Sequence, residues 1–421
     1  MAAAPLAAQA PHAFVGARII PVAGPEIADG VLLVEGAKIR AVGRRGQVAI
    51  PQGATVVELA GKVVMPGLVD THSHIGNGDG GDRSNPIQGD ARILDALDAR
   101  SDNIQRAQAG GITTVNVMPG SGHLMSGQTV YLKLRDGGTI NDLLVCRDPM
   151  TEVCGGMKMA NGTNPRGDPP WPGTRAKAAA LVRERFVKAQ EYRAKLRAAG
   201  DDASKRPDRS LELDALVEVL DGKRMVHFHT HRHDDILTVL RLREEFGFRV
   251  TLHHVSDAWK VADEIAAAKV PSSIIVLDAP GGKQEALDVS MTNGAALEKA
   301  GAAVGFHTDD GITDSRFFLR SAALAVRAGM SPGAALAALT RAGAAMLDLA
   351  DRVGTLEPGK DADFIVLSGD PFSTYTHVEQ TWVEGRKVFD RADPKDRAYQ
   401  LGGYGVMNDR DVHWHQGMED H

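Results

Sequence analysis

The hydrophobic and polar positions along the chain form two different patterns. Residues 13–64 carry short apolar runs broken by glycine turns, a pattern typical of β-strands. The same pattern returns near the end of the chain, in DADFIVLSGD and HVEQTWVEGRKVF. We therefore predict one small β-sandwich built from both chain ends, over residues 12–66 and 357–393.

The middle of the chain, residues 67–356, alternates apolar runs with helical patterns. The candidate strands number eight: GLVDTH, ITTVNVM, GQTVYLKL, EVCGGMKM, MVHFH, RVTLHH, SSIIVLD and AAVGFHTD. Eight βα units over about 290 residues predict the α/β fold class, as a (β/α)8 TIM barrel. A doubly wound sheet is the alternative, and the third run could instead belong to a loop. Polar residues gather at the carboxyl ends of the strands, and this placement favours the barrel.

Composition and charge limit the kinds of partner that we expect. The 421 residues carry a formal net charge of -6 and no basic stripe, so we expect no nucleic-acid partner. No stretch approaches the roughly 20 apolar residues that span a bilayer, so we expect no membrane partner either. Cys146 and Cys154 could form a disulfide in an oxidising compartment or stay as free thiols.

The two ends of the chain have their own compositions. Residues 1–11 read as the remnant of a leader, because AQA before Pro11 is an A-x-A cleavage pattern. A periplasmic or secreted location follows from this interpretation; the alternative is a disordered alanine-rich start of a cytoplasmic protein. Residues 394–421 are expected to form a C-terminal tail.

Histidines concentrate at the predicted strand ends. Eight of the 15 histidines lie there, which scattered core histidines would not do, and Asp309 lies beside them: His72, His74, His227, His229, His231, His253, His254 and His307. In the HxH of the first strand both side chains face one way, because strand residues alternate with a period of two. Imidazole and carboxylate are the ligands that zinc prefers at a hydrolytic centre. The pattern predicts a divalent-metal site.

Several segments together resemble the amidohydrolase superfamily, in the branch of imidazolonepropionase and metal-dependent dipeptidase-like enzymes. The resemblance rests on MPGLVDTHSHIG, AGGITTVNVMPGSG, GMKMANGTNPRG, HTHRHDDILTVLRLREEFGF, GFHTDD and RVGTLEPGKDADFIVLSGDPF. It implies one or two Zn²⁺ or similar ions, a carboxylated Lys158 that bridges them, and Asp309 as ligand and catalytic proton acceptor. The full ligand set that it implies is His72, His74, Lys158, His229, His254 and Asp309.

The residues alone leave some assignments open. His227 or His231 could replace His229, since alternation puts all three on one face. Alternation also lets only one of His253 and His254 face inward; the resemblance selects His254, and His253 would then pack outward. Asp310 competes with Asp309. Lys158 could be an ordinary buried lysine paired to an acid. Related chains have Gly-Glu-Asn-Pro-Lys where this one has GTNPR, so Thr163 replaces an acid, and a single-metal site gains weight.

Four further residues are candidates for binding substrate. His123 lies in a loop after the second strand, and His231 could tune the site or extend the metal shell. Arg232 and Arg166 could bind a substrate carboxylate, although surface salt bridges are the alternative for both.

The resemblance implies a metal-dependent hydrolase that cleaves an amide bond, peptide-like or N-acyl, with a metal-activated hydroxide. The expected partner is a small molecule or short peptide, and relatives commonly form homo-oligomers. The alternatives are a deaminase or a cyclic-amide or lactone hydrolase on the same scaffold, and a catalytically silent assembly subunit.

Overall fold

A computed structural model describes residues 10–78, 80–276 and 283–402. Most of the predicted leader remnant and residues 403–421 of the predicted tail lie outside the described residues. The first part of that tail is a helix, α11 (Pro394–Leu401), which begins with a proline and is capped by the carboxylate of Asp393.

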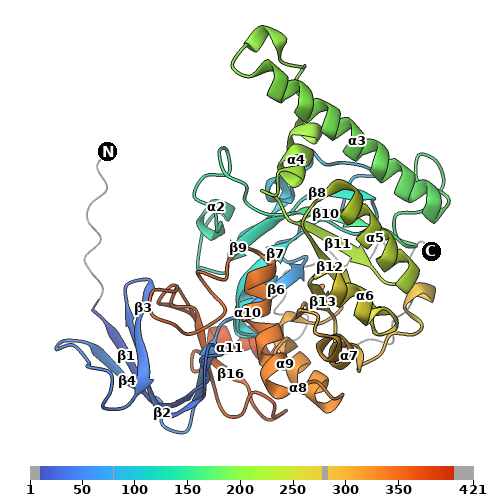
Figure 1. The fold of residues 1–421 in the computed structure, drawn as a ribbon. Coiled ribbons are helices and arrows are strands. Elements are labelled where there is room, and N and C mark those ends of the chain that lie inside the picture. The colour runs from blue at the N-terminus through green and yellow to red at the C-terminus, as the bar shows by residue number, and fades with distance from the viewer. Residues whose placement is uncertain (1–9, 79, 277–282, 403–421) are drawn as a thin grey trace.

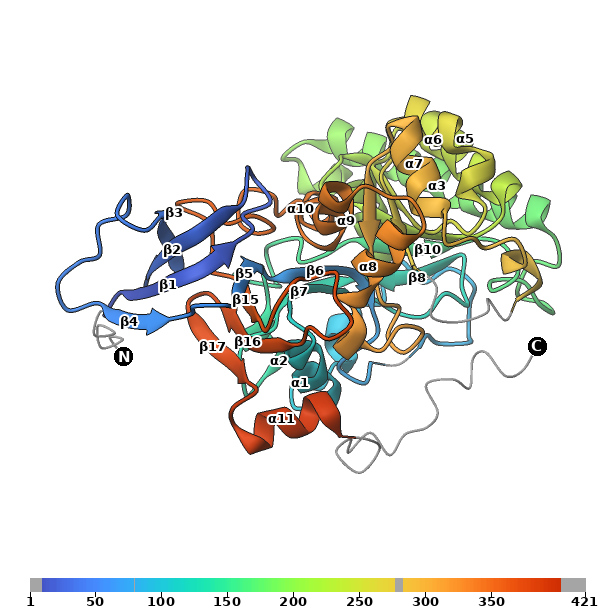
Figure 2. The ribbon, with the colours of Figure 1, turned by 90° about the horizontal axis from the view of Figure 1, so that it is seen from below.

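Both ends of the chain contribute strands to one eight-stranded sheet (Figures 1 and 2). β5 of the N-terminal part pairs antiparallel with β15 of the C-terminal part. The rings of Phe14, Phe364 and Trp382 pack together, with Phe14 4.8 and 4.9 Å from the other two. The ladder is a single sheet, so a sandwich of two sheets stays a prediction. Its strands are β1 (His12–Ile19), β2 (Ile27–Glu35), β3 (Lys38–Arg44), β4 (Thr55–Glu58), β5 (Val63–Pro66), β15 (Phe364–Leu367), β16 (Val378–Val383) and β17 (Arg386–Asp390).

The middle of the chain forms a TIM-barrel-like α/β arrangement whose strands lie in two ladders. Six strands are ordered β14-β13-β12-β11-β10-β8, and three are ordered β6-β7-β9. One continuous segment, residues 125–133, supplies β8 to the six-stranded ladder and β9 to the three-stranded ladder. The two ladders are also linked where the backbone N–H of Asp309 donates to His72 O at 2.9 Å. No β14–β6 strand pairing joins them in the described residues, so full closure stays a prediction. The strands are β6 (Leu68–Ser73), β7 (Ile112–Val117), β8 (Met125–Gln128), β9 (Val130–Lys133), β10 (Met157–Ala160), β11 (Val226–Thr230), β12 (Val250–His254), β13 (Ser272–Ile274) and β14 (Val304–Phe306).

The third strand departs from the predicted barrel. The GQTVYLKL run falls in β8 and β9, which pair antiparallel with β10 and β7. A uniformly parallel barrel was therefore the wrong prediction. β8 and β9 follow each other directly and run in the direction opposite to β7 and β10, so the chain reverses direction through residues 118–124.

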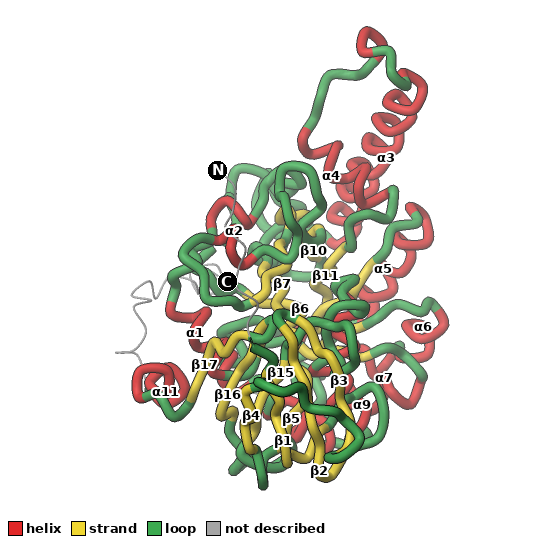
Figure 3. The backbone as a smooth tube through the Cα atoms, turned by 90° about the vertical axis from the view of Figure 1, so that its left-hand side faces the viewer, coloured by secondary structure: helices red, strands yellow, loops and turns green. Residues whose placement is uncertain are grey.

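The helices of the middle region follow the predicted alternation after β10. Helix α3, the long charged stretch, buries Val182, Phe186 and Ala189 on one side and exposes its charges on the other. With α4 it extends beyond the strands in Figures 1 and 3. Within the described residues, no helix has both the length and the apolarity needed to cross a membrane. The helices are α1 (Asp102–Ala109), α2 (Ile140–Leu143), α3 (Arg175–Ala199), α4 (Leu211–Leu220), α5 (His233–Phe246), α6 (Ala262–Ala267), α7 (Asn293–Ala300), α8 (Arg320–Arg327), α9 (Pro332–Leu339) and α10 (Arg341–Met346).

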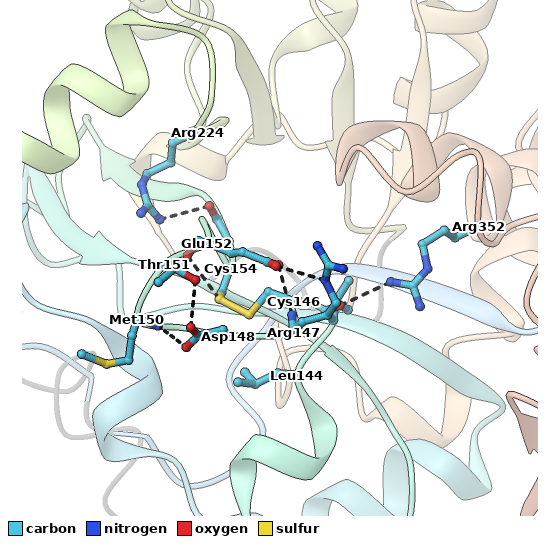
Figure 4. The surroundings of a disulfide bond; sticks show 12 residues. Leu144, Cys146, Arg147, Asp148, Met150, Thr151, Glu152, Cys154, Arg224 and Arg352 are labelled. Atoms are coloured by element: carbon cyan, nitrogen blue, oxygen red, sulfur yellow. Dashed lines mark hydrogen bonds and ion pairs between the residues drawn. A yellow bond between two sulfur atoms is a disulfide. The ribbon is translucent and has the colours of Figure 1, made fainter.

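The two cysteines form a disulfide, so the free-thiol alternative does not hold in this structure. The bond closes a short surface loop before β10, with the Cα atoms of Cys146 and Cys154 5.2 Å apart (Figure 4). Arg352 donates to Val145 O at 3.3 Å and Arg224 donates to Gly155 O at 3.1 Å. The base of the loop is therefore anchored to two other parts of the chain.

Candidate metal centre

The ends of β6, β10, β11 and β12 and the segment after β14 bring the predicted ligands together. Three groups of side chains each hold ligand atoms within 4.8 Å of one another. His254 belongs to two of the groups and His72 to two, so the three groups form one continuous cluster. The groups are His72, His74 and Asp309; His229, His231 and His254; and His72, His254 and His307.

His74 and Asp309 show why this cluster suits a cation. His74 Nδ1 lies 2.9 Å from Met118 O, and since a carbonyl only accepts, Nδ1 carries a proton. In the neutral ring, Nε2 then directs a lone pair at Asp309 Oδ1, 2.9 Å away. That contact is favourable only with a proton or a metal ion between the two atoms. His72 Nε2 lies 3.2 Å from the same oxygen, so a shared ion can use all three.

Unpartnered ring nitrogens fit the same interpretation. His72 Nδ1, both nitrogens of His229, His231 Nε2 and His254 Nε2 are buried without a hydrogen-bond partner in the described residues. Buried polar atoms are normally satisfied, so several orphans in one place call for a ligand. Burial also lowers the pKa of His72, His229 and His254 well below the ordinary value. The neutral imidazoles that result are the form that binds metal.

Lys158 lies at the base of the cluster on β10 and is fully buried. Its ammonium donates to His72 Nε2 at 3.0 Å and lies 3.0 Å from the sulfur of Met118. Among the described residues it forms no ion pair, although the charge of Asp309 opposes the effect of burial on its pKa. Burial lowers the pKa of Lys158 to about 7. The amine is thus held next to the predicted metal ligands without a counter-ion of its own.

His253 is placed differently from the prediction. Both His253 and His254 lie inside the cluster: the His253 ring is 5.1 Å from His72, and His227 Nδ1 is 3.0 Å from His253 Nε2. The prediction that His253 packs outward was wrong because His254 adopts a φ of 68°, which breaks the alternation at the end of β12. Asp310 turns away from Asp309 and accepts from Ser315 Oγ at 2.8 Å.

The predicted substrate-binding residues are distributed unevenly. His231 lies in the cluster. His123 Nε2 contacts Asp82 O at 2.6 Å, and its ring packs near Trp171. Arg232 is held by both oxygens of Asp234, which is the surface salt bridge foreseen as its alternative. Arg166 donates to Gly162 O at 3.0 Å. The structure therefore gives neither arginine a place among the ligands.

The sequence alone did not single out Lys283, which follows β13. Lys283 is half-buried and donates to Asn164 Oδ1 at 3.0 Å, in the GTNPR segment. Burial lowers the pKa of His231, and the charge of Lys283 lowers it further. Burial also lowers the pKa of Lys283, and the charge of Asp309 opposes that shift. Nearby, buried Glu285 accepts from the backbone N–H of Thr163 at 2.7 Å. A carboxylate from another loop thus lies beside the position where related chains carry an acid.

Comparison with known proteins agrees with this site. The sequence pattern of the Amidohydrolase family matches residues 63–388, so the chain belongs to that family. Members of this family are hydrolases that act on C–N bonds and are typically metal-dependent. The finer assignment to the imidazolonepropionase-related branch stays a prediction.

Individual relatives support the family and the fold. The chain is 27% identical over 372 residues to "Amidohydrolase tasK" of Hapsidospora irregularis, covering 81% of this chain but 38% of that protein. A crystal structure of an amidohydrolase from Thermotoga maritima MSB8 matches with 33% identity and a TM-score of 0.84, over 90% of this chain and 100% of that one. A prolidase complexed with N-methylphosphonate-L-proline shares the fold, with 18% identity, a TM-score of 0.57, and 90% and 99% coverage.

Proposed function

We propose that this amidohydrolase cleaves an amide bond, peptide-like or N-acyl, in a small substrate with one or two divalent ions, zinc foremost. The ions are held by His72, His74, His229, His254, Asp309 and Lys158, the last of these in carboxylated form. The observation that carries the proposal is the convergence of His74 Nε2, His72 Nε2 and the Asp309 carboxylate around one point.

A divalent ion bound there acidifies coordinated water and polarises a carbonyl. Asp309 supplies the proton transfer. Burial favours its neutral form, but His74 and the charge of Lys158 hold the pKa of Asp309 well below its usual range. The carboxylate is therefore ionised at neutral pH, so it can accept a proton from the attacking water and pass it to the leaving nitrogen. Its backbone N–H, bonded to His72 O, keeps it beside β6.

Lys283 supports a substrate that carries a carboxylate. Like Lys158, Lys283 forms no ion pair among the described residues, whereas Arg232 is paired with Asp234. A half-buried ammonium with one neutral partner leaves two N–H donors for a ligand anion. In a peptide-like substrate, the terminal carboxylate has the chemistry to bind there.

Substitution of Lys283 tests this substrate class. Lys283→Gln is expected to raise KM about tenfold or more for N-acyl amino acids and dipeptides, with little change for the same compounds capped as amides. Arg232→Gln is the matched control and is expected to leave both KM values within twofold. Equal effects on capped and free substrates would contradict recognition of a carboxylate.

Metal analysis and one substitution test the hydrolase itself. Purified protein is expected to contain zinc or another divalent metal, and Asp309→Asn is expected to lower kcat by at least about a thousandfold with an unchanged circular dichroism spectrum. Asp310→Asn is the neighbouring control and should keep most activity. A product assay for free amine against ammonia separates amide hydrolysis from deamination. Near-normal turnover in Asp309→Asn would remove Asp309 from this role.

We also propose a periplasmic or secreted location, because the Cys146–Cys154 disulfide suits an oxidising compartment and the start of the chain has a cleavage-like pattern. Fractionation of cells that express the protein at its natural level tests this. A homo-oligomeric state is proposed from the family resemblance, and light scattering of the purified protein tests it.

A further inference from the structure

We infer that His231 is a third imidazole ligand, which completes a three-histidine site with His229 and His254. The inference rests on the proposed metal-dependent function. It changes the role of His231 from contact with substrate to coordination, and it makes one ion independent of a carboxylated Lys158.

The first argument is proximity. His229, His231 and His254 each offer a nitrogen, and the three nitrogens lie within 4.8 Å of one another. The rings pack closely, with centroids 4.7 Å apart for His229 and His231 and 4.9 Å apart for His231 and His254. His229 and His231 project from one side of the chain because they are two residues apart at the end of β11.

The second argument is the hydrogen bond on the far side of the His231 ring. Nδ1 lies 2.7 Å from the hydroxyl of buried Ser256, whereas Nε2 is buried with no partner in the described residues. When Nδ1 donates its proton to Ser256, Nε2 carries the lone pair that a metal requires. Ligating histidines are normally oriented in this way, by a bond from the nitrogen that does not bind the metal.

His254 is oriented by a similar chain. Its Nδ1 lies 3.4 Å from His307 Nε2, and His307 Nδ1 lies 2.8 Å from Ser273 Oγ, which contacts Thr71 Oγ1 at 2.7 Å. With each group donating toward Thr71, His254 keeps its proton on Nδ1 and its lone pair on Nε2. The unpartnered Nε2 atoms of His231 and His254 therefore present the same chemistry to the same space.

Three neutral imidazole ligands suit the charge of this side of the cluster. Thr163 stands where related chains carry an acid, so this side of the cluster lacks that carboxylate. Three neutral imidazoles hold zinc without one and leave a fourth position for water or substrate. His227 provides the contrast on the same strand, because Tyr131 Oη and His253 Nε2 already occupy both of its nitrogens at 2.9 and 3.0 Å.

The test compares His231→Gln with His227→Gln in the full-length protein. Metal-free samples are titrated with Zn²⁺ against a competing chelator and with Co²⁺, whose visible absorption reports the ligand number. We expect His231→Gln to lower the affinity for one Zn²⁺ ion at least about a hundredfold and to change the Co²⁺ spectrum. His227→Gln should keep its Zn²⁺ affinity within about threefold of the wild type. Ser256→Ala should lower the affinity for the same ion about tenfold, because it removes only the hydrogen bond that orients the His231 ring.

The outcomes separate three situations. Unchanged Zn²⁺ affinity and an unchanged Co²⁺ spectrum in both His231→Gln and Ser256→Ala would overturn the inference. If His231→Gln in that case also loses turnover while it keeps its full metal content, His231 acts in substrate binding or proton transfer instead. If His231→Gln does not fold, Ser256→Ala alone decides. Wild-type protein that binds no divalent ion would instead contradict the proposed function.

Discussion

Two fully buried lysines, Lys133 and Lys158, show how differently the two regions of the molecule treat a buried charge. Lys133 lies at the junction between the barrel-like region and the eight-stranded sheet, where it is paired with Asp363 and lies 3.0 Å from Asp361. Lys158 lies at the metal centre, where its neighbours are a histidine nitrogen and a methionine sulfur. The first lysine is neutralised by its surroundings, and the second is not.

The difference indicates where the fold is optimised for stability and where it is not. Asp361 also accepts from Lys38 at 2.7 Å and Arg352 at 2.9 Å, so the junction is a closed network of opposite charges. At the metal centre, unpartnered nitrogens and an unpaired amine are kept together at a cost in stability. Sites that bind a ligand commonly carry such unsatisfied groups.

The largest expected effect on stability is at the junction. Lys133→Met is expected to lower the free energy of unfolding by about 3–5 kcal/mol, because it leaves Asp363 buried without its cation. Urea unfolding measures this. Lys188→Met, which breaks an exposed pair with Glu184 on α3, should cost less than about 1 kcal/mol. Similar losses in both variants would show that the junction network contributes no more than a surface pair.

Metal binding should produce the next largest effect, confined to the other region. At a free Zn²⁺ concentration a hundredfold above Kd, the folded state is expected to gain about 2.7 kcal/mol over the chelated protein. Thermal unfolding with and without chelator measures the gain. Lys133→Met should show the same gain, because distant sites contribute independently. A gain that vanished in Lys133→Met would show that the two regions are coupled.

A pH dependence extends the comparison to carboxyl groups. Asp70, at the metal centre, is buried and bonded only to neutral donors, Thr308 Oγ1 at 2.5 Å and the backbone N–H groups of Thr308 and His72. Burial raises the pKa of Asp70 to about 7 from its ordinary 3.8.

Between these two pH values the folded state of the metal-free protein retains a proton that the unfolded chain has lost. The contribution of Asp70 to the stability of that form should therefore fall as pH rises, by at most about 1.4 kcal/mol per unit. The buried histidines contribute in the opposite direction, because burial lowers their pKa values. Urea titrations at several pH values isolate this contribution as the difference in free energy of unfolding between the wild type and Asp70→Asn, which should fall as pH rises from about 4 to 7. A difference that does not change with pH would contradict the raised pKa of Asp70.

The smallest expected effect on stability is at Lys158. Lys158→Met should change the free energy of unfolding by less than about 1 kcal/mol, or raise it, because it replaces an unpaired buried amine with an apolar chain of similar length. Turnover should nevertheless fall sharply if Lys158 bridges the ions. A loss as large as that of Lys133→Met would remove the contrast between the two lysines.

The sequence predicted the fold class and the gathering of strand-end residues because both follow from local patterns. Alternation placed His72 and His74 on one side, and the structure brings both to Asp309. It failed for His253, since the left-handed backbone at His254 leaves no signature in a His-His pair. The antiparallel direction of β8 and β9 depends on pairing with β10 and β7, which the apolar run of GQTVYLKL does not encode.

Other features depend on contacts across long sequence separations. Lys283 reaches Asn164, and Ser256 orients His231, through loops whose paths no periodicity encodes. The pairing of the two cysteines likewise required their separation in space, which sequence spacing does not give. Patterns therefore identified candidate ligands, whereas the residues that orient them needed coordinates.

The joining of β5 to β15 has a consequence for how the protein is made. Roughly three hundred residues separate these partners, so the first strands to leave the ribosome have no β15 to pair with until nearly the whole chain has been synthesised. Their apolar face, with Phe14 at its centre, must wait for Phe364 and Trp382. Such a long-range closure is a slow step in folding. During that interval the newborn N-terminal strands are the part of the molecule most exposed to aggregation or in need of a chaperone.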